Sequence, residues 1–323
     1  MSSLNHNPDR SRRPEALLRR LEWTVIKRLD GLLQGDYRTL FRGTGLDLAD
    51  LREYQPHDDV RYIDWNITAR MQVPYVREYN VDRELTAWFL LDMSPSIDFG
   101  AYQTSKRAML IEFVTVMARL LTRNGNRVGV MFYGSELDHM IPARSGRNHV
   151  LHIIKALNAR RHMPRSAETN LERFFRTAFN VMKRRSMVFA ISDFLSAPGW
   201  EQVLGMMARR HEVMAVRLYD PLEEEMPDLG MVMMEDAESG EQLLVDTHDA
   251  GMRRRFAELA QAREEHMLNA FGAAGVDALE LSTTDDLMET VLRFAELRGK
   301  RIRLGGDKGT GNRLTALQGQ AAQ

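Results

Sequence analysis

The chain has 323 residues, of which 44% are hydrophobic and 28% charged, and its 44 basic side chains nearly balance 45 acidic ones. A chain of this length can bury a sizeable core, and its lack of cysteine excludes disulfides, thiolate zinc sites, iron–sulfur clusters and cysteine nucleophiles. The near-neutral charge argues against a dedicated nucleic-acid-binding protein, because such proteins usually carry a strong basic excess.

The first 81 residues divide into a polar start and a mixed region. Residues 1–13 are polar and rich in arginine, and we expect them to be disordered. Pro14 opens an amphipathic pattern that predicts a helix, and glycines and prolines punctuate short stretches from Gly43 to Tyr79. Residues 14–81 are therefore expected to form an N-terminal helix and a small β-rich region. With no signal peptide and no apolar run of spanning length, we expect a cytoplasmic protein without membrane insertion.

Residues 82–298 alternate between apolar strands and amphipathic helices. Strands are predicted at 87–92, 127–133, 187–193, 212–218 and 276–281. Helices are predicted at 106–121, 146–158, 170–184, 199–210, 249–271 and 284–298. A hairpin is predicted from 231–234 and 242–245, and residues 299–323 are expected to form a mobile tail. This alternation predicts an α/β fold with a doubly wound, mostly parallel sheet covered on both faces.

The sharpest local feature follows the first predicted core strand, where Asp92, Ser94 and Ser96 occupy alternate positions. In open α/β sheets ligands bind beyond the carboxyl ends of the strands, and oxygen side chains suit Mg²⁺ or Mn²⁺. Alone the pattern is weak, because Asp and Ser also cap helices and form turns. A second acid, Asp193, ends another core strand, and Thr169 precedes a predicted helix between them. We predict that these five side chains converge at one sheet edge.

This order of residues resembles the metal-ion-dependent adhesion site of the von Willebrand factor A fold, a Rossmann-like fold. The resemblance implies that Ser94, Ser96 and Thr169 are hydroxyl ligands, while Asp92 and Asp193 bind the metal directly or through water. It also implies an open metal position, which a carboxylate of a partner protein fills.

A second set of motifs lies in the mixed region. These motifs are Phe41–Gly45, Leu51–Tyr54, Pro56–Asp59, Arg61–Asn66, Ala69–Arg70 and Val76–Tyr79. Together with the adhesion-site pattern they resemble the bacterial "domain of unknown function 58" family, from about residue 35 to 290. The resemblance implies a von Willebrand factor A-like domain at 82–298 and association with a MoxR-type AAA+ ATPase. Two features depart from the usual pattern: Asn170 follows the threonine where an acid is common, and Ala167–Glu168 replaces a small lead-in.

These features predict a metal-dependent protein–protein interaction module and not an enzyme. Mg²⁺ or Mn²⁺ would capture an acidic side chain of a client or of the ATPase, and by resemblance the chain would serve as adaptor or chaperone-like partner in protein assembly or maturation. A Mg²⁺-dependent hydrolase or phosphotransferase is an alternative that needs a nucleophile or base, and Asp98 and His57 are candidates that spacing does not place. A metal-free scaffold is a second alternative.

The segment Arg61–Asn66 mixes charged and aromatic side chains. It forms either a docking surface beside the metal site or a buried network in which Asp64 accepts hydrogen bonds from arginine. Large residue types such as Trp65 favour the buried network, with the indole filling a gap between the strands and the core.

Overall fold

A computed structural model describes residues 14–26, 50–55, 60, 63, 65–78, 85–100, 104–134, 137–160, 169–236 and 239–304. Several sequence predictions lie outside these residues. They concern the ends of the chain (1–13 and 305–323), the Phe41–Gly45 motif, His57, Asp64 and Ala167–Glu168.

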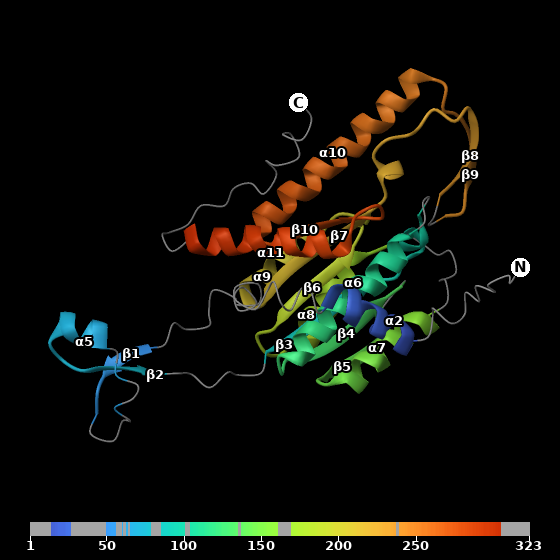
Figure 1. The fold of residues 1–323 in the computed structure, drawn as a ribbon. Coiled ribbons are helices and arrows are strands. Elements are labelled where there is room, and N and C mark those ends of the chain that lie inside the picture. The colour runs from blue at the N-terminus through green and yellow to red at the C-terminus, as the bar shows by residue number, and fades with distance from the viewer. Residues whose placement is uncertain are drawn as a thin grey trace, which may run out of the picture.

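A six-stranded sheet forms the centre of the molecule (Figure 1). Its strands are β3 (Thr86–Asp92), β4 (Arg127–Tyr133), β5 (Leu137–Arg144), β6 (Met187–Ser192), β7 (Glu212–Tyr219) and β10 (Asp277–Ser282). They lie in the order β10–β7–β6–β3–β4–β5, and every neighbouring pair is parallel except β4–β5. The predicted α/β fold with a mostly parallel sheet is therefore confirmed.

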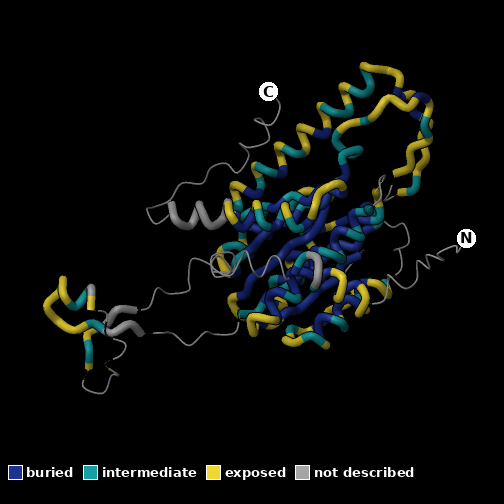
Figure 2. The backbone as a smooth tube through the Cα atoms, in the orientation of Figure 1, coloured by how far each residue is buried: buried dark blue, intermediate teal, exposed yellow. Residues whose placement is uncertain are grey.

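Helices cover both faces of the sheet because its strands carry apolar side chains on both sides (Figure 2). The buried apolar side chains form two hydrophobic clusters, one on each face of the sheet. Phe89 and Leu91 of β3 belong to the first cluster, whereas Leu90, which lies between them in the strand, belongs to the second. The first cluster includes side chains of α2 (Pro14–Leu21), α6 (Lys106–Arg123), α7 (Arg147–Ala159) and α11 (Leu287–Leu304). The second includes side chains of α8 (Leu171–Val181), α9 (Trp200–Arg210) and α10 (Ala250–Ala274). In the described part of the chain, no helix combines the length and apolarity needed to cross a membrane.

The strand β5 has no counterpart among the predicted strands. It is the antiparallel edge of the sheet, and Asp138, His139 and Met140 are exposed on it. Its side chains lack the continuous apolar run of the buried strands, and Pro142 is tolerated because an edge strand leaves one side of its backbone unpaired.

The mixed region contains β1 (Asp50–Glu53) paired antiparallel with β2 (Tyr75–Glu78), as its predicted β character requires. Between them lies a short helix, α5 (Trp65–Met71), that the sequence pattern did not predict. Trp65 is 68% exposed, so the interpretation of this side chain as a buried filler is wrong. The physical reason is that two short strands and a seven-residue helix enclose too little volume to bury an indole.

His211, at the end of α9, is expected to contribute a loss of stability below pH 6.5. Its ring is buried against Phe179, and neither ring nitrogen has a hydrogen-bond partner among the described residues. Burial, followed by the charge of Arg210, lowers the pKa of His211 to about 4. The unfolded ring takes up a proton below pH 6.5 and the folded ring only near pH 4, so acidification costs about 3 kcal/mol of unfolding free energy.

Urea unfolding at pH 7 and pH 4.5 measures this loss. His211→Phe keeps a ring of similar size without a titrating group, so its loss between the two pH values should be smaller than that of the wild type. The same substitution at the exposed His152 is the control. Equal losses in the wild type and in His211→Phe would contradict the prediction.

Candidate metal centre

The candidate site lies where the direction of the chain connections reverses. Strand β3 leads into α6 on one face of the sheet, whereas the neighbouring strand β6 leads into α9 on the other face. Between two such strands the loops diverge and leave a crevice at the carboxyl edge, which is where ligands bind in open α/β sheets. Asp92 is the last residue of β3, and Asp193 directly follows β6.

Asp92 is held by donors on both of its carboxylate oxygens. The backbone N–H of Ser94 donates to Oδ1 at 2.9 Å, and the Ser192 hydroxyl donates to Oδ2 at 2.6 Å. The Ser94 and Ser96 hydroxyl oxygens lie 3.1 Å apart. Asp92, Ser94 and Ser96 are all buried, so this hydrogen-bonded cluster lies inside the protein.

Burial raises the pKa of Asp92 to about 7, and the nearby charge of Asp193 acts in the same direction. The hydrogen bonds from Ser192 and Ser94 oppose this rise but do not cancel it. Two buried carboxylates that repel one another make a site that gains from a bound cation, because the cation removes the cost of keeping both ionised.

Lys106, the first residue of α6, lies in the candidate site and was missed by the sequence analysis. Its side chain is fully buried, and its Nζ donates to Asp193 Oδ2 at 2.9 Å and to Glu223 Oε1 at 2.7 Å. Burial acts to lower the pKa of Lys106, but the charges of Asp193 and Glu223 outweigh it and the pKa is raised. A signal was available, because a lysine opposes the helix dipole at a helix N-terminus and therefore needs a specific partner there.

Glu223 ties this ion pair to the next strand. It ends the short 3₁₀ helix η4 (Pro221–Glu223), which follows β7, and its Oε2 accepts the backbone N–H of Asp220 at 3.0 Å. Asp220 is itself buried and accepts the hydroxyl of Thr283, after β10, at 2.7 Å. Polar contacts therefore continue along the carboxyl edge of the sheet from β6 to β10.

The loop after β6 has a backbone conformation that orients Asp193. Phe194 has φ of 58°, in the left-handed region that side chains other than glycine rarely adopt. Its ring is buried against Trp200 and Phe271, and this packing holds the conformation in place. The turn directs the backbone N–H of Leu195 toward Asp193 Oδ1, at 3.1 Å.

Thr169 is buried on the loop before α8 and is anchored to the same edge. Its carbonyl accepts the Ser196 hydroxyl at 2.6 Å, and the N–H of the following residue, Asn170, donates to the Tyr133 hydroxyl at 3.1 Å. Tyr133 ends β4 beside Asp92. The side chain of Asn170 accepts the backbone N–H of Arg173 and so caps the N-terminus of α8. The asparagine that stands where the family pattern commonly has an acid therefore has a structural role.

The donor set fits a hard dication. When ionised, Asp92, Asp193 and Glu223 with Lys106 leave a net formal charge of −2, which a divalent cation would balance. Among the described residues no group of three or more acidic or histidine side chains could hold a metal, so ligation would depend on the hydroxyls as well. Oxygen donors of this kind match Mg²⁺ and Mn²⁺.

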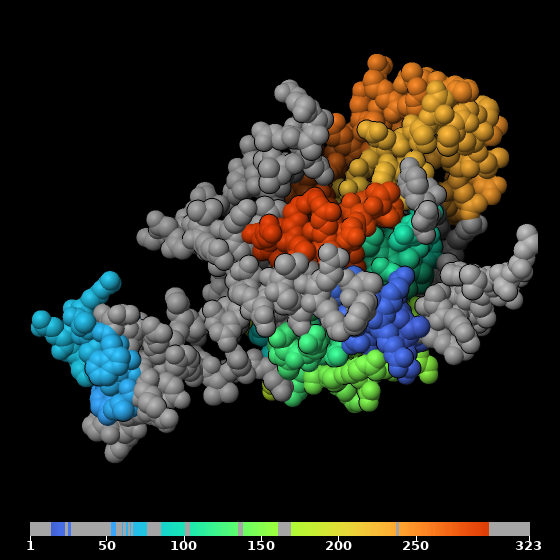
Figure 3. Space-filling model, in the orientation of Figure 1, coloured from blue at the N-terminus to red at the C-terminus, as the bar shows by residue number. Residues whose placement is uncertain are grey.

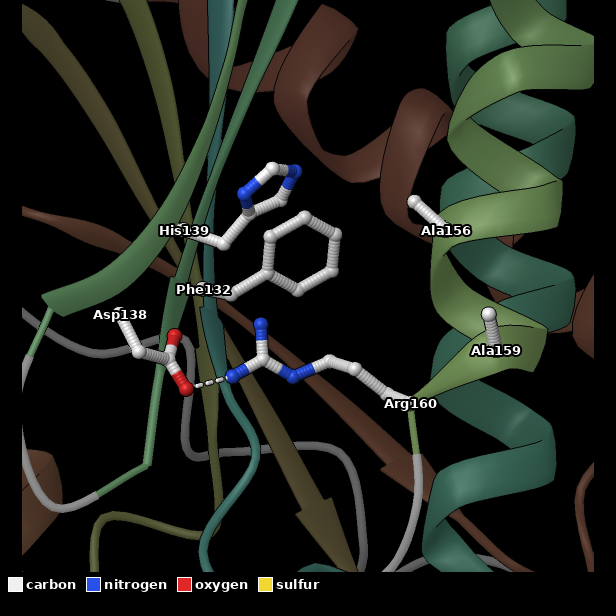
Figure 4. A pocket seen from close by; sticks show the side chains of 6 residues that line it. All are labelled: Phe132, Asp138, His139, Ala156, Ala159 and Arg160. Carbon is white, nitrogen blue, oxygen red and sulfur yellow. Dashed lines mark hydrogen bonds and ion pairs between the residues drawn. The ribbon is translucent and has the colours of Figure 1, made fainter.

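A separate pocket of about 330 Å³ lies between β5 and α7 (Figure 4). Arg160 reaches across it to pair with Asp138, and its guanidinium lies 4.7 Å from the centre of the Phe132 ring. The pocket shares no residue with the candidate metal centre, and the two charged side chains that line it already bind each other.

Comparison with known proteins gives the family. The model of the family described as "Protein of unknown function DUF58" matches residues 50–266. Uncharacterized proteins Rv1480 of Mycobacterium tuberculosis and Mb1516 of Mycobacterium bovis are each 36% identical over 283 residues, covering 88% of this chain and 89% of their own.

Solved structures align more distantly. The hypothetical protein BatB from Bacteroides thetaiotaomicron aligns with a TM-score of 0.45 and 12% identity over 67% of this chain and 99% of its own. The SpRpn10 VWA domain aligns with a TM-score of 0.37 and 11% identity over 65% and 95%. The family resemblance seen in the motifs is confirmed by the family model, and the chain belongs to the DUF58 family of proteins of unknown function.

Proposed function

We propose that the chain is a protein-interaction module that binds Mg²⁺ or Mn²⁺ at Asp92, Ser94, Ser96, Thr169 and Asp193 and uses the metal to bind a carboxylate of a partner protein. The observation that carries the proposal is the buried cluster of two repelling carboxylates and paired serine hydroxyls at the point where the sheet connections reverse. A dication with an open position would lower the desolvation cost of the partner's carboxylate and fix its orientation.

The family resemblance extends this proposal to a partner. The resemblance implies association with a MoxR-type AAA+ ATPase, so the ATPase or its client is the proposed source of the carboxylate. The chain would then act as an adaptor or chaperone-like partner in the assembly or maturation of another protein.

A capture experiment tests the proposal. The full chain is immobilised, and binding of a purified MoxR-type ATPase from the same organism is measured. Capture should occur in Mg²⁺, fall at least tenfold in EDTA, and fall equally for Ser94→Ala with Ser96→Ala, because both changes remove the metal. Glu258→Gln, an exposed carboxylate on α10, is the matched control and should bind as wild type. Capture that is equal in Mg²⁺ and EDTA would contradict metal dependence.

Catalysis at this edge is less well supported. Asp98, a candidate nucleophile, is paired with Arg107, and the Ser94 hydroxyl contacts that of Ser96. A phosphatase assay with p-nitrophenyl phosphate and a nuclease assay, each with and without Mg²⁺, check the alternative. Robust Mg²⁺-dependent turnover that Asp92→Ala abolishes would overturn the interaction proposal.

A metal-free scaffold is the second candidate, and Lys106 is the observation that favours it. The ammonium already neutralises Asp193, so one carboxylate of the site has a cation within the protein. Titration calorimetry separates the two candidates, since the scaffold predicts no heat of Mg²⁺ or Mn²⁺ binding in the wild type.

A further inference from the structure

The segment between Arg217 and Arg253 has an unusual charge. It contains eleven aspartate and glutamate residues and no lysine or arginine, although the whole chain is nearly neutral. Asp220 is buried, and Glu223, Glu224 and Asp228 are paired with Lys106, Arg217 and Arg253. The other seven acids leave the segment negatively charged, which attracts cations and repels anions. Asp220 and Glu223 of this segment belong to the polar network beside the candidate metal centre, but the hairpin within the segment shares no residue with that centre.

The segment includes an antiparallel hairpin of β8 (Met231–Glu235) and β9 (Gln242–Asp246). It lies at the outer end of the molecule beside the start of α10 (Figures 1 and 3). The pairs Met231–Asp246, Met233–Leu244 and Glu235–Gln242 share one face, because alternate residues of a strand point to the same side.

This face, which we call the methionine face, carries exposed side chains, and the backbone of the hairpin is coloured mostly as exposed or intermediate in Figure 2. Met231 and Met233 are each 61% exposed, and Leu244 is 55% exposed. Three large apolar side chains side by side on a strand pair are more than the scattered exposed residues of an ordinary surface, and clustered ones mark interaction sites. Methionine is common at such sites because its side chain adapts to different partners.

The hairpin is anchored to the protein at one end, whereas Met234 and Leu243 on the face opposite the methionine face are exposed as well. Val245 is buried on the opposite face, and the buried Thr247 accepts the N–H of Leu229 and donates to the carbonyl of Gly230, both at 2.8 Å. A two-stranded sheet alone is marginally stable, so the anchor presents the methionine face outward in a defined position.

The charges at the two ends of the face select its occupant. Asp246 lies opposite Met231 at one end, and Glu235 and Gln242 form the pair at the other. A second copy of the same hairpin would place acids against acids, and an anionic membrane would be repelled by Glu235 and Asp246 on the face. An apolar segment flanked by lysine or arginine complements both the apolar centre and the acidic ends.

We propose that the methionine face is a docking site for a cationic amphipathic segment of another protein. The partner's apolar side chains cover Met231, Met233 and Leu244, and its basic side chains lie against Glu235 and Asp246. Apolar burial supplies the affinity, and the charges supply orientation and discrimination.

Fluorescence anisotropy with two labelled peptides of about 15 residues tests the proposal. One peptide carries leucine and lysine at amphipathic helical spacing, and the other replaces every lysine with glutamate. The full chain should bind the lysine peptide at least tenfold more tightly than the glutamate peptide. Met233→Ser with Leu244→Ser should weaken binding of the lysine peptide at least tenfold, and Glu235→Gln with Asp246→Asn should weaken it and reduce its salt dependence.

Leu259→Ser is the matched control, because Leu259 is a 66% exposed leucine on α10 outside the hairpin, and it should leave binding unchanged. Circular dichroism and thermal unfolding check that each variant folds. Absence of binding, equal binding of both peptides, or equal loss in Leu259→Ser would overturn the proposal. So would concentration-dependent dimers in sedimentation, or binding to phosphatidylglycerol vesicles, that the Met233→Ser and Leu244→Ser variant loses.

Discussion

Replacing Lys106 with methionine is expected to lower the free energy of unfolding by about 3–5 kcal/mol in metal-free buffer. The methylene chain of lysine is closely matched by methionine, so the loss arises from the charge and not from a cavity. Asp193 would remain buried without its cation, and Glu223 would lose its contact as well. Urea unfolding in EDTA measures the effect, and Lys155→Met, an exposed lysine on α7, should change stability by less than about 0.5 kcal/mol.

Two further measurements tie this loss to the charge. Adding Asp193→Asn to Lys106→Met should recover part of the stability, because the orphaned carboxylate is then neutral. Mg²⁺ should stabilise Lys106→Met more than the wild type, since a cation bound to the folded state replaces the missing ammonium. An unfolding free energy of Lys106→Met equal to that of the wild type would show that the buried ion pair contributes nothing to the fold.

The central sheet could be predicted because its strands have one simple property. Residues such as Phe89, Leu90 and Leu91 are apolar on both faces, and only a strand covered by helices on both sides has this composition. The edge strand β5 could not be predicted in this way, because it is mostly exposed and carries a proline. Helix α5 is equally hard to predict, since seven residues are too few to show a helical period.

Part of the candidate site could likewise be predicted from the sequence, and part of it could not. Asp92, Ser94, Ser96 and Asp193 could be placed at a common edge because strand ends of a parallel sheet meet at one edge. Lys106 could not be placed in the site from sequence, because its partner Asp193 is 87 residues away and its partner Glu223 is 117 away. Only the chain path after β7 brings Glu223 to the ammonium.

Asp92→Asn is expected to weaken Mn²⁺ binding at least a hundredfold while the metal-free protein keeps its fold. The carboxylate is the charged member of the Asp92, Ser94 and Ser96 cluster, and an amide is a much poorer ligand for a hard dication. Because burial and Asp193 make the ionised form of Asp92 unfavourable, removing its charge relieves a cost in the folded state.

The substitution also costs one hydrogen bond, which offsets this gain in stability. Both oxygens of Asp92 accept a hydrogen bond, and the amide nitrogen of asparagine cannot accept one. The unfolding free energy of Asp92→Asn in EDTA should therefore lie within about 1 kcal/mol of the wild-type value or above it. Titration calorimetry with Mn²⁺ and urea unfolding in EDTA measure the two quantities separately. Wild-type affinity for Mn²⁺ in the variant would remove Asp92 from the metal site. A loss of several kcal/mol without metal would instead make Asp92 a structural residue, and only retained stability with lost affinity identifies it as a ligand.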